Sequence, residues 1–146
     1  MYNGLLHAHS GLRWLVLVSL VLAIILGFYG WLSKKEWKNT DGKVGLFLMI
    51  FMDLQLLVGL ILYVFVSPIT RVAFQDFGAA MKNADLRFYA VEHILLMLVA
   101  LVLVHIGRAR TKKEMPGWKR HRNAAFFYTI SLVIILIAIP WERGLF

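Results

Sequence analysis

Ionisable and strongly polar side chains are rare inside the long apolar blocks of this 146-residue chain. Each one costs free energy in apolar surroundings, so each needs a functional or structural reason. The residues concerned are His7, His9, Arg13, Asp53, Gln55, Glu92, His93 and His105, with His121 just before the last block. The chain has no cysteine, which excludes thiolate metal sites, iron–sulfur clusters and disulfides.

His9 and His93 are the residues whose types and placement best suit ligation. His9 and Arg13 are four residues apart and share one face of a helix, while His93 lies in another block, one turn before Met97. Two neutral imidazoles from separate helices can bind the two axial sides of a haem iron, and an arginine one turn away can pair with a haem propionate. We therefore predict one haem b held by His9, His93 and Arg13. The alternative is that each histidine is a hydrogen-bonded packing residue.

The remaining histidines are weaker candidates for haem ligation. His7 is about 200° around the helix from His9, so the two cannot readily serve one ligand. His105 and His121 form a possible second pair, for a second haem, although His121 also reads as a solvated member of the basic cluster 119–122. Counting at about 1.5 Å per residue places His9 a few to about 15 Å above His93, and helix tilt closes only part of that gap.

Three further polar residues suit proton transfer or quinone binding. Asp53 and Gln55 are about 160° apart on a helix and should face different neighbours. Asp53 or Glu92 could pass protons if a quinol is oxidised here. For each of these residues an interhelical hydrogen bond is an equally good interpretation.

Four apolar stretches position all of these residues: Leu12–Ser33, Val44–Val66, Phe88–Gly107 and Ala124–Pro140. Each is close to the roughly 20 residues that cross a bilayer. The chain is 60% hydrophobic and 16% charged, with a mean hydropathy of +0.72, and no stretch carries the polar stripe of a soluble bundle. We predict an all-α, integral membrane, four-helix up-down-up-down bundle as a single domain over residues 1–146. A nucleic-acid binder is excluded, because its basic residues would cover a face that water reaches.

The net charge of +8 predicts the orientation of the chain. Eleven of the sixteen basic residues lie in the connections after the first and third stretches, and short cytoplasmic loops collect Lys and Arg. Both termini and the loop Ser67–Arg87 should then lie on the non-cytoplasmic side of a bacterial inner membrane. The segment Thr70–Asn83 suits a short interfacial helix. Ser19, Ala23, Gly27 and Gly30 form a small-residue stripe that allows close helix packing.

Four segments resemble small bacterial four-span membrane proteins labelled "cytochrome b". They are residues 4–14 (GLLHAHSGLRW), 53–60 (DLQLLVGL), 86–93 (LRFYAVEH) and 138–141 (AIPW). More distantly, the chain is similar to the haem-binding four-helix units of haem A synthase and of membrane protoporphyrinogen oxidase. The resemblance implies a b-type haem and electron transfer but does not choose the ligands.

The sequence leaves three functional hypotheses. The first is a membrane cytochrome that moves electrons between a quinol, or another membrane donor, and a partner. The second is a cofactor-free accessory or assembly subunit of a larger respiratory or transport complex, docked through the small-residue stripe and one of the polar residues of the second stretch, Asp53 or Gln55. The third is an enzyme of haem metabolism with the middle loop as a lid.

Overall fold

The computed structural model describes residues 1–143, and all regular structure in that range is helical. Two of the four long helical segments contain a π-helical turn, η1 and η2. In such a turn the backbone hydrogen bonds join residues five positions apart instead of four. The elements in chain order are α1 (Tyr2–Leu32), α2 (Asn39–Ile61), η1 (Leu62–Val66), α3 (Pro68–Gln75), α4 (Phe77–Lys82), α5 (Ala84–Arg87), η2 (Phe88–Glu92), α6 (His93–Thr111) and α7 (Gly117–Ala138).

Four helical segments are long and apolar enough to cross a membrane, as predicted. They are Tyr2–Leu32, Asn39–Val66, Ala84–Thr111 and Gly117–Ala138. The helices begin earlier than the apolar stretches suggested, by ten residues in the first segment, because helical hydrogen bonding continues into the polar flanks. Large apolar side chains such as Val18, Ile25 and Ile137 are more than half exposed, a distribution that suits lipid and not water.

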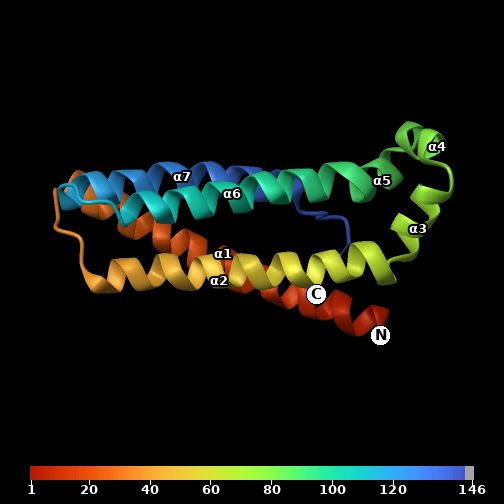
Figure 1. Cartoon of the computed structure of the whole chain (residues 1–146), viewed down its shortest axis with the longest axis horizontal. Coiled ribbons are helices and arrows are strands. Elements are labelled where there is room, and N and C mark those ends of the chain that lie inside the picture. Colours follow the sequence, from red (N-terminus) through yellow and green to blue (C-terminus); the bar gives the residue numbers. More distant parts are fainter. Residues whose placement is uncertain (144–146) are drawn as a thin grey trace.

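α6 and α7 form one layer of the bundle, and α2 with the N-terminal half of α1 forms the other, while the C-terminal half of α1 crosses toward α7 (Figure 1). α1 packs mainly against α2 and α7, and α6 packs mainly against the same two helices. α1 and α6 are therefore diagonal partners in the bundle. They run in the same direction and face each other across its centre, which confirms the up-down-up-down order and determines which residues can meet there.

The small-residue stripe of α1 packs inside the chain. An added Cβ on Gly27 would lie 2.9 Å from the backbone nitrogen of Ala125, and one on Gly30 would overlap the ring of His121. Ala23, Gly27 and Gly30 are all buried. The stripe is thus the contact surface between α1 and α7 and is not available for docking a partner.

The middle segment forms three short helices where one was predicted. Ser67 caps α3, with Pro68 at the first helical position, while Asp76 caps α4 and Asn83 caps α5. Each cap side chain accepts a hydrogen bond from a backbone N–H of the following turn. These caps start a new helix every few residues, so the chain bends repeatedly instead of forming one longer helix.

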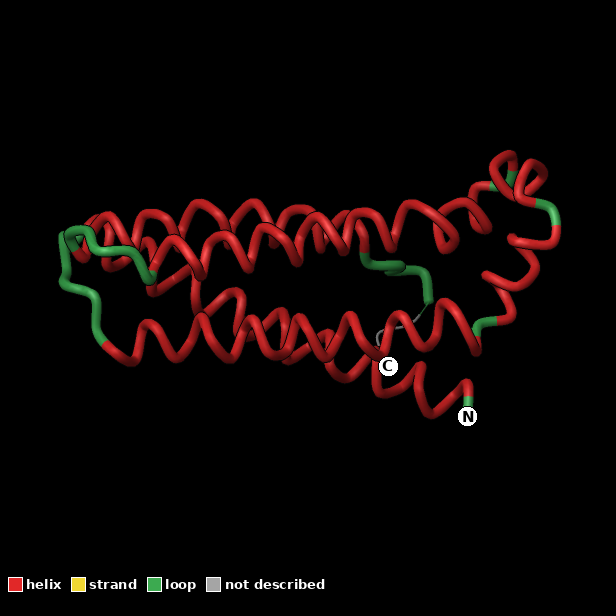
Figure 2. Tube along the Cα trace, in the orientation of Figure 1, coloured by secondary structure: helices red, strands yellow, loops and turns green. Residues whose placement is uncertain are grey.

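The two ends of the bundle differ. One end holds the connections α1–α2 and α6–α7, which Figure 2 shows as loops; we call it the basic end. The other end holds the N-terminus and α3 to α5; we call it the cavity end. Past α7 the chain bends away from the helix (Figures 1 and 2), and Pro140 and Arg143 of this segment line the cavity at this end.

Candidate functional site

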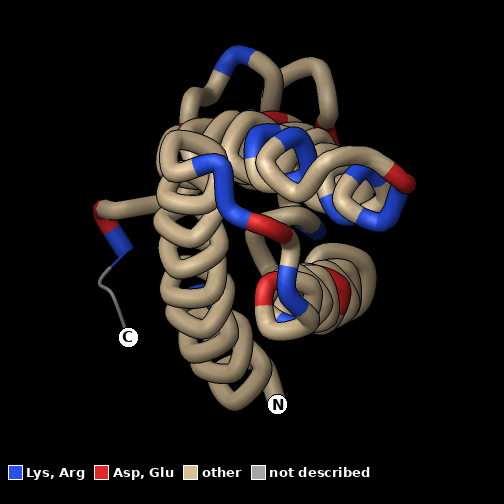
Figure 3. The backbone as a smooth tube through the Cα atoms, turned by 90° about the vertical axis from the view of Figure 1, so that its left-hand side faces the viewer, with Lys and Arg blue, Asp and Glu red and all other residues tan. Residues whose placement is uncertain are grey.

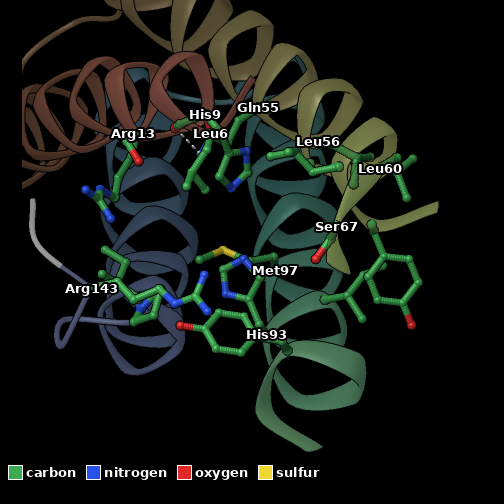
Figure 4. Close-up of a pocket in the computed structure, with 18 of the residues that line it drawn as sticks. Leu6, His9, Arg13, Gln55, Leu56, Leu60, Ser67, His93, Met97 and Arg143 are labelled. Atoms are coloured by element: carbon green, nitrogen blue, oxygen red, sulfur yellow. Dashed lines mark hydrogen bonds between the residues drawn. The ribbon is translucent and has the colours of Figure 1, made fainter. Parts of the chain in front are cut away.

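A cavity of about 210 Å³ lies between the two layers at the cavity end. α1, α2, α6, η2 and the segment after α7 all contribute to its walls, which are mainly apolar (Figure 4). Met52, Leu101 and Ile135 lie toward the core of the bundle, and the polar groups His9, His93, Arg13, Gln55 and Arg143 converge on the same space. An apolar cavity with a few convergent polar groups is the usual form of a cofactor or ligand site.

His9 and His93 face each other across this cavity (Figure 4). Their ring centroids are 6.3 Å apart and their planes are inclined by 68°. The structure thus brings together the two histidines that the sequence singled out. The separation of 6.3 Å between the ring centroids lies at the lower end of the difference in height that residue counting predicted.

Two features of the helices help to bring the two rings this close. α1 begins at Tyr2 and crosses the bundle obliquely (Figure 1), so its residues advance less along the bundle axis than a straight count gives. On the opposite side, the π-helical turn η2 ends directly before His93. Such turns change the facing and the rise of the residues that follow, and neither change is visible in hydrophobic spacing.

The orientation of His93 is fixed by the segment after α7. Its Nδ1 lies 2.7 Å from the carbonyl oxygen of Ala138, and a carbonyl can only accept, so Nδ1 carries the proton. Nε2 is then the unprotonated nitrogen with a lone pair available for a metal. Hydrogen bonding of the second ring nitrogen to a carbonyl is the common arrangement behind metal-bound histidine.

His9 is held by α2. Gln55 donates from Nε2 to the carbonyl oxygen of His9 at 2.9 Å, and an added Cβ on Gly59 would come within 3.0 Å of the His9 ring. Gly59 therefore makes room for the imidazole. Nδ1 of His9 is buried and has no hydrogen-bond partner among residues 1–143. The alternative prediction, that His9 is a packing residue with its ring nitrogens hydrogen-bonded, therefore does not describe this nitrogen.

The pair fits two axial ligands of one haem iron. Metal–imidazole bonds of about 2 Å on opposite sides of an ion, with roughly 1 Å more to each ring centre, separate two centroids by about 6 Å. The observed 6.3 Å agrees with that value. Among the described residues, no three or more His, Cys, Asp or Glu side chains gather as a metal site.

Two arginines line the same cavity. Arg13 was predicted from its spacing to His9, whereas Arg143 was missed. The guanidinium of Arg143 lies 4.3 Å over the ring of Tyr89, beside His93. A signal for Arg143 exists in the sequence, because it is one of only five basic residues outside the two basic connections. Two guanidinium groups at one cavity suit the two carboxylates of a haem.

Comparison of the chain with models of protein families, with curated proteins and with solved structures found no match.

The predicted proton or quinone residues each contact a different part of the chain. Gln55 faces His9, whereas Asp53 pairs with His105 on α6 at 2.7 Å. The Asp53 and His105 side chains are 48% and 40% exposed, on the outside of the bundle. Glu92 accepts a hydrogen bond from Nε of Arg87 at 2.7 Å. Asp53 and Gln55 thus face different neighbours as predicted, and Gln55 alone of the three lines the cavity.

The second histidine pair is not formed. His105 is bonded to Asp53, while His121 packs against Trp37 at 4.8 Å between ring centroids and lies 3.2 Å from the carbonyl oxygen of Glu36. The prediction of a solvated His121 is also wrong, because its exposed fraction is 3%. The small residue Gly30 leaves the space that the His121 ring fills. His7 is exposed, although it touches the rim of the cavity.

Proposed function

We propose that this chain is a membrane-bound b-type cytochrome that holds one haem b between α1 and α6. It would transfer electrons between a quinol, or another membrane donor, and a redox partner. The single observation that carries the proposal is the facing pair of imidazoles, His9 and His93, with ring centroids 6.3 Å apart in an apolar cavity. A bound haem would supply one-electron transfer at its iron.

The residues around the pair have separable roles in this proposal. His93, oriented by Ala138, and His9, held through Gln55, would hold the iron. Arg13 and Arg143, which line the same cavity, would pair with the propionates. The apolar walls exclude water, which keeps the local dielectric low and so affects the reduction potential.

The basic end faces the cytoplasm of a bacterial inner membrane in this proposal, and the cavity opens toward the other side. The docking face of an accessory subunit loses the small-residue stripe, because that stripe is buried against α7. Of that face, Asp53 on α2 is 48% exposed. A role in haem metabolism would use the same site, with Ile69 and Thr70 of α3 as part of a lid, since both line the cavity. That role predicts that the bound haem is chemically altered, whereas a cytochrome keeps its haem chemically intact through each cycle of reduction and oxidation.

Visible spectra of the detergent-purified protein test the proposal. After expression in haem-replete cells, we expect a Soret band in the oxidised form and a sharp α-band on reduction with dithionite. His9→Ala and His93→Ala should each abolish the six-coordinate spectrum. His7→Ala is the matched control, two residues from His9 and exposed, and should leave the spectrum unchanged. A wild-type protein without a Soret band would overturn the proposal.

A further inference from the structure

A second cavity, of about 510 Å³, lies at the basic end, far along the bundle from the histidine pair. The α1–α2 connection, the first turns of α2, the last turn of α6 and the start of α7 form it. Its lining includes five basic side chains and, among the described residues, no acidic one: Lys38, Lys43, Arg108, Lys112 and Arg120. Such a concentration of positive charge is unfavourable unless an anion neutralises it.

Two of these side chains are fixed in place by the fold. Arg108 donates from Nη1 to the carbonyl oxygen of Gly42 at 3.1 Å, and its Nε is buried without a hydrogen-bond partner among residues 1–143. Arg120 donates from Nε to the carbonyl oxygen of Thr111, and its guanidinium lies 5.0 Å over the ring of Trp37. A guanidinium has five N–H donors. The bonds to Gly42 and Thr111 use one donor on each arginine, so donors remain for an anion with several acceptor oxygens.

The positive-inside tendency accounts for basic residues at this end but not for this arrangement. The two connections and their flanking turns hold eleven basic and three acidic residues, and the rest of the chain holds five of each, so the net charge of +8 lies entirely at this end. Figure 3 looks along the bundle onto it and shows Lys and Arg segments around the rim. Asp41, the acidic residue of the first turn of α2, is bonded to the backbone N–H of Lys38 and does not line the cavity.

The surface next to this cavity is apolar on the membrane side. Leu46 lines the cavity, and Ile50, one turn further along the same face of α2, is 38% exposed. A ligand with an anionic head and an apolar tail therefore fits better than a small inorganic ion. The head would meet Lys43, Arg108 and Arg120, and the tail would lie along α2 toward the bilayer centre.

We propose that this cavity binds the phosphodiester headgroup of an anionic phospholipid in the leaflet at the basic end. The site is independent of haem and of the function proposed above. Its recognition element is the pair of fixed arginines with the lysines Lys38, Lys43 and Lys112 around them.

Titration of the detergent-purified chain with short-chain phosphatidylglycerol tests this site, with thermal unfolding and native mass spectrometry as readouts. We expect saturable binding and a rise in the unfolding temperature, and no such effect with phosphatidylcholine of the same chain length. The paired variant Lys43→Gln with Lys112→Gln should weaken binding about tenfold or more. The matched control is Arg110→Gln with Lys113→Gln, which removes the same charge at the same end from exposed residues outside the cavity, and should change affinity less than about twofold.

Three outcomes would overturn the proposal. Equal weakening in both paired variants would show diffuse attraction and no site. Stabilisation by millimolar inorganic phosphate, with nothing added by phosphatidylglycerol, would assign the cavity to a free anion. Absence of saturable lipid binding would remove the site altogether. Arg108→Gln removes a fixed guanidinium and is a sharper test if the variant folds. If it does not fold, the paired variant Lys43→Gln with Lys112→Gln still tests the proposal.

Discussion

Individual residues set the geometry of the proposed haem site, and Gly59 does so by leaving space for the His9 ring. Because an added Cβ there approaches the His9 ring to 3.0 Å, we expect Gly59→Leu to displace the imidazole. Overpacking of this kind costs about 1–3 kcal/mol, which corresponds to roughly 10- to 100-fold weaker haem binding. Haem titration of the purified variant measures the effect. Gly11→Leu, where a Cβ meets open space, should bind haem normally.

Arg143 gives a second prediction at this scale. If it pairs with a propionate, Arg143→Gln loses a charge-assisted hydrogen bond of about 1.5–3 kcal/mol. Haem should then bind about 10- to 100-fold more weakly. The midpoint potential should also fall, because loss of a nearby positive charge favours the more positive ferric form. Lys82→Gln removes a charge at the same end outside the cavity and should change neither quantity; an identical shift in both variants would contradict the pairing.

Pairs of helices carry the next level of organisation, and the contact between α1 and α7 depends on Gly27. Gly27→Leu would force its side chain into the backbone at Ala125 and should destabilise the bundle by about 1–3 kcal/mol. Thermal unfolding in detergent measures the loss as a lower midpoint. Gly4→Leu lies on the same helix in open space. A similar loss in Gly4→Leu would show that α1 does not depend on this contact.

The contact between α2 and α6 includes the exposed pair Asp53–His105. Hydrogen bonds of this kind within membranes average about 0.6 kcal/mol, so His105→Leu should lower stability only slightly. Because His105 does not meet His121, the variant should keep the wild-type ratio of one haem per chain. Pigment analysis against protein concentration measures the ratio. A ratio of two haems per chain in the wild type that falls to one in His105→Leu would instead show that His105 holds a second haem.

At the scale of the whole molecule, charge predicts the orientation in the membrane. The chain has no cysteine, so single introduced cysteines report accessibility without background. A membrane-impermeant maleimide should label Gln75→Cys in α3 in spheroplasts, in which the outer face of the inner membrane is accessible. It should label Lys113→Cys only after the membrane is opened. The reverse pattern would place the haem cavity on the cytoplasmic side.

The sequence by itself determined the helical class, the four spans and the identity of the histidine pair. These follow from composition and from the cost of polar groups in apolar surroundings, both of which are properties of single residues and their neighbours. The pairing of Asp53 and Gln55 with different neighbours also follows from local helix geometry. The ends of the helices were less predictable, because hydrogen bonding continues past the apolar stretch, as at Tyr2.

Only the tertiary structure decided which groups meet. The tilt of α1 and the turn η2 bring His9 and His93 to 6.3 Å between ring centroids, and the segment after α7 brings Ala138 and Arg143 to the same cavity. Gly30 buries His121 by leaving space for its ring on another helix. These contacts join residues up to 91 positions apart in sequence, as for Gly30 and His121. They depend on how whole helices pack, which spacing along one helix does not encode.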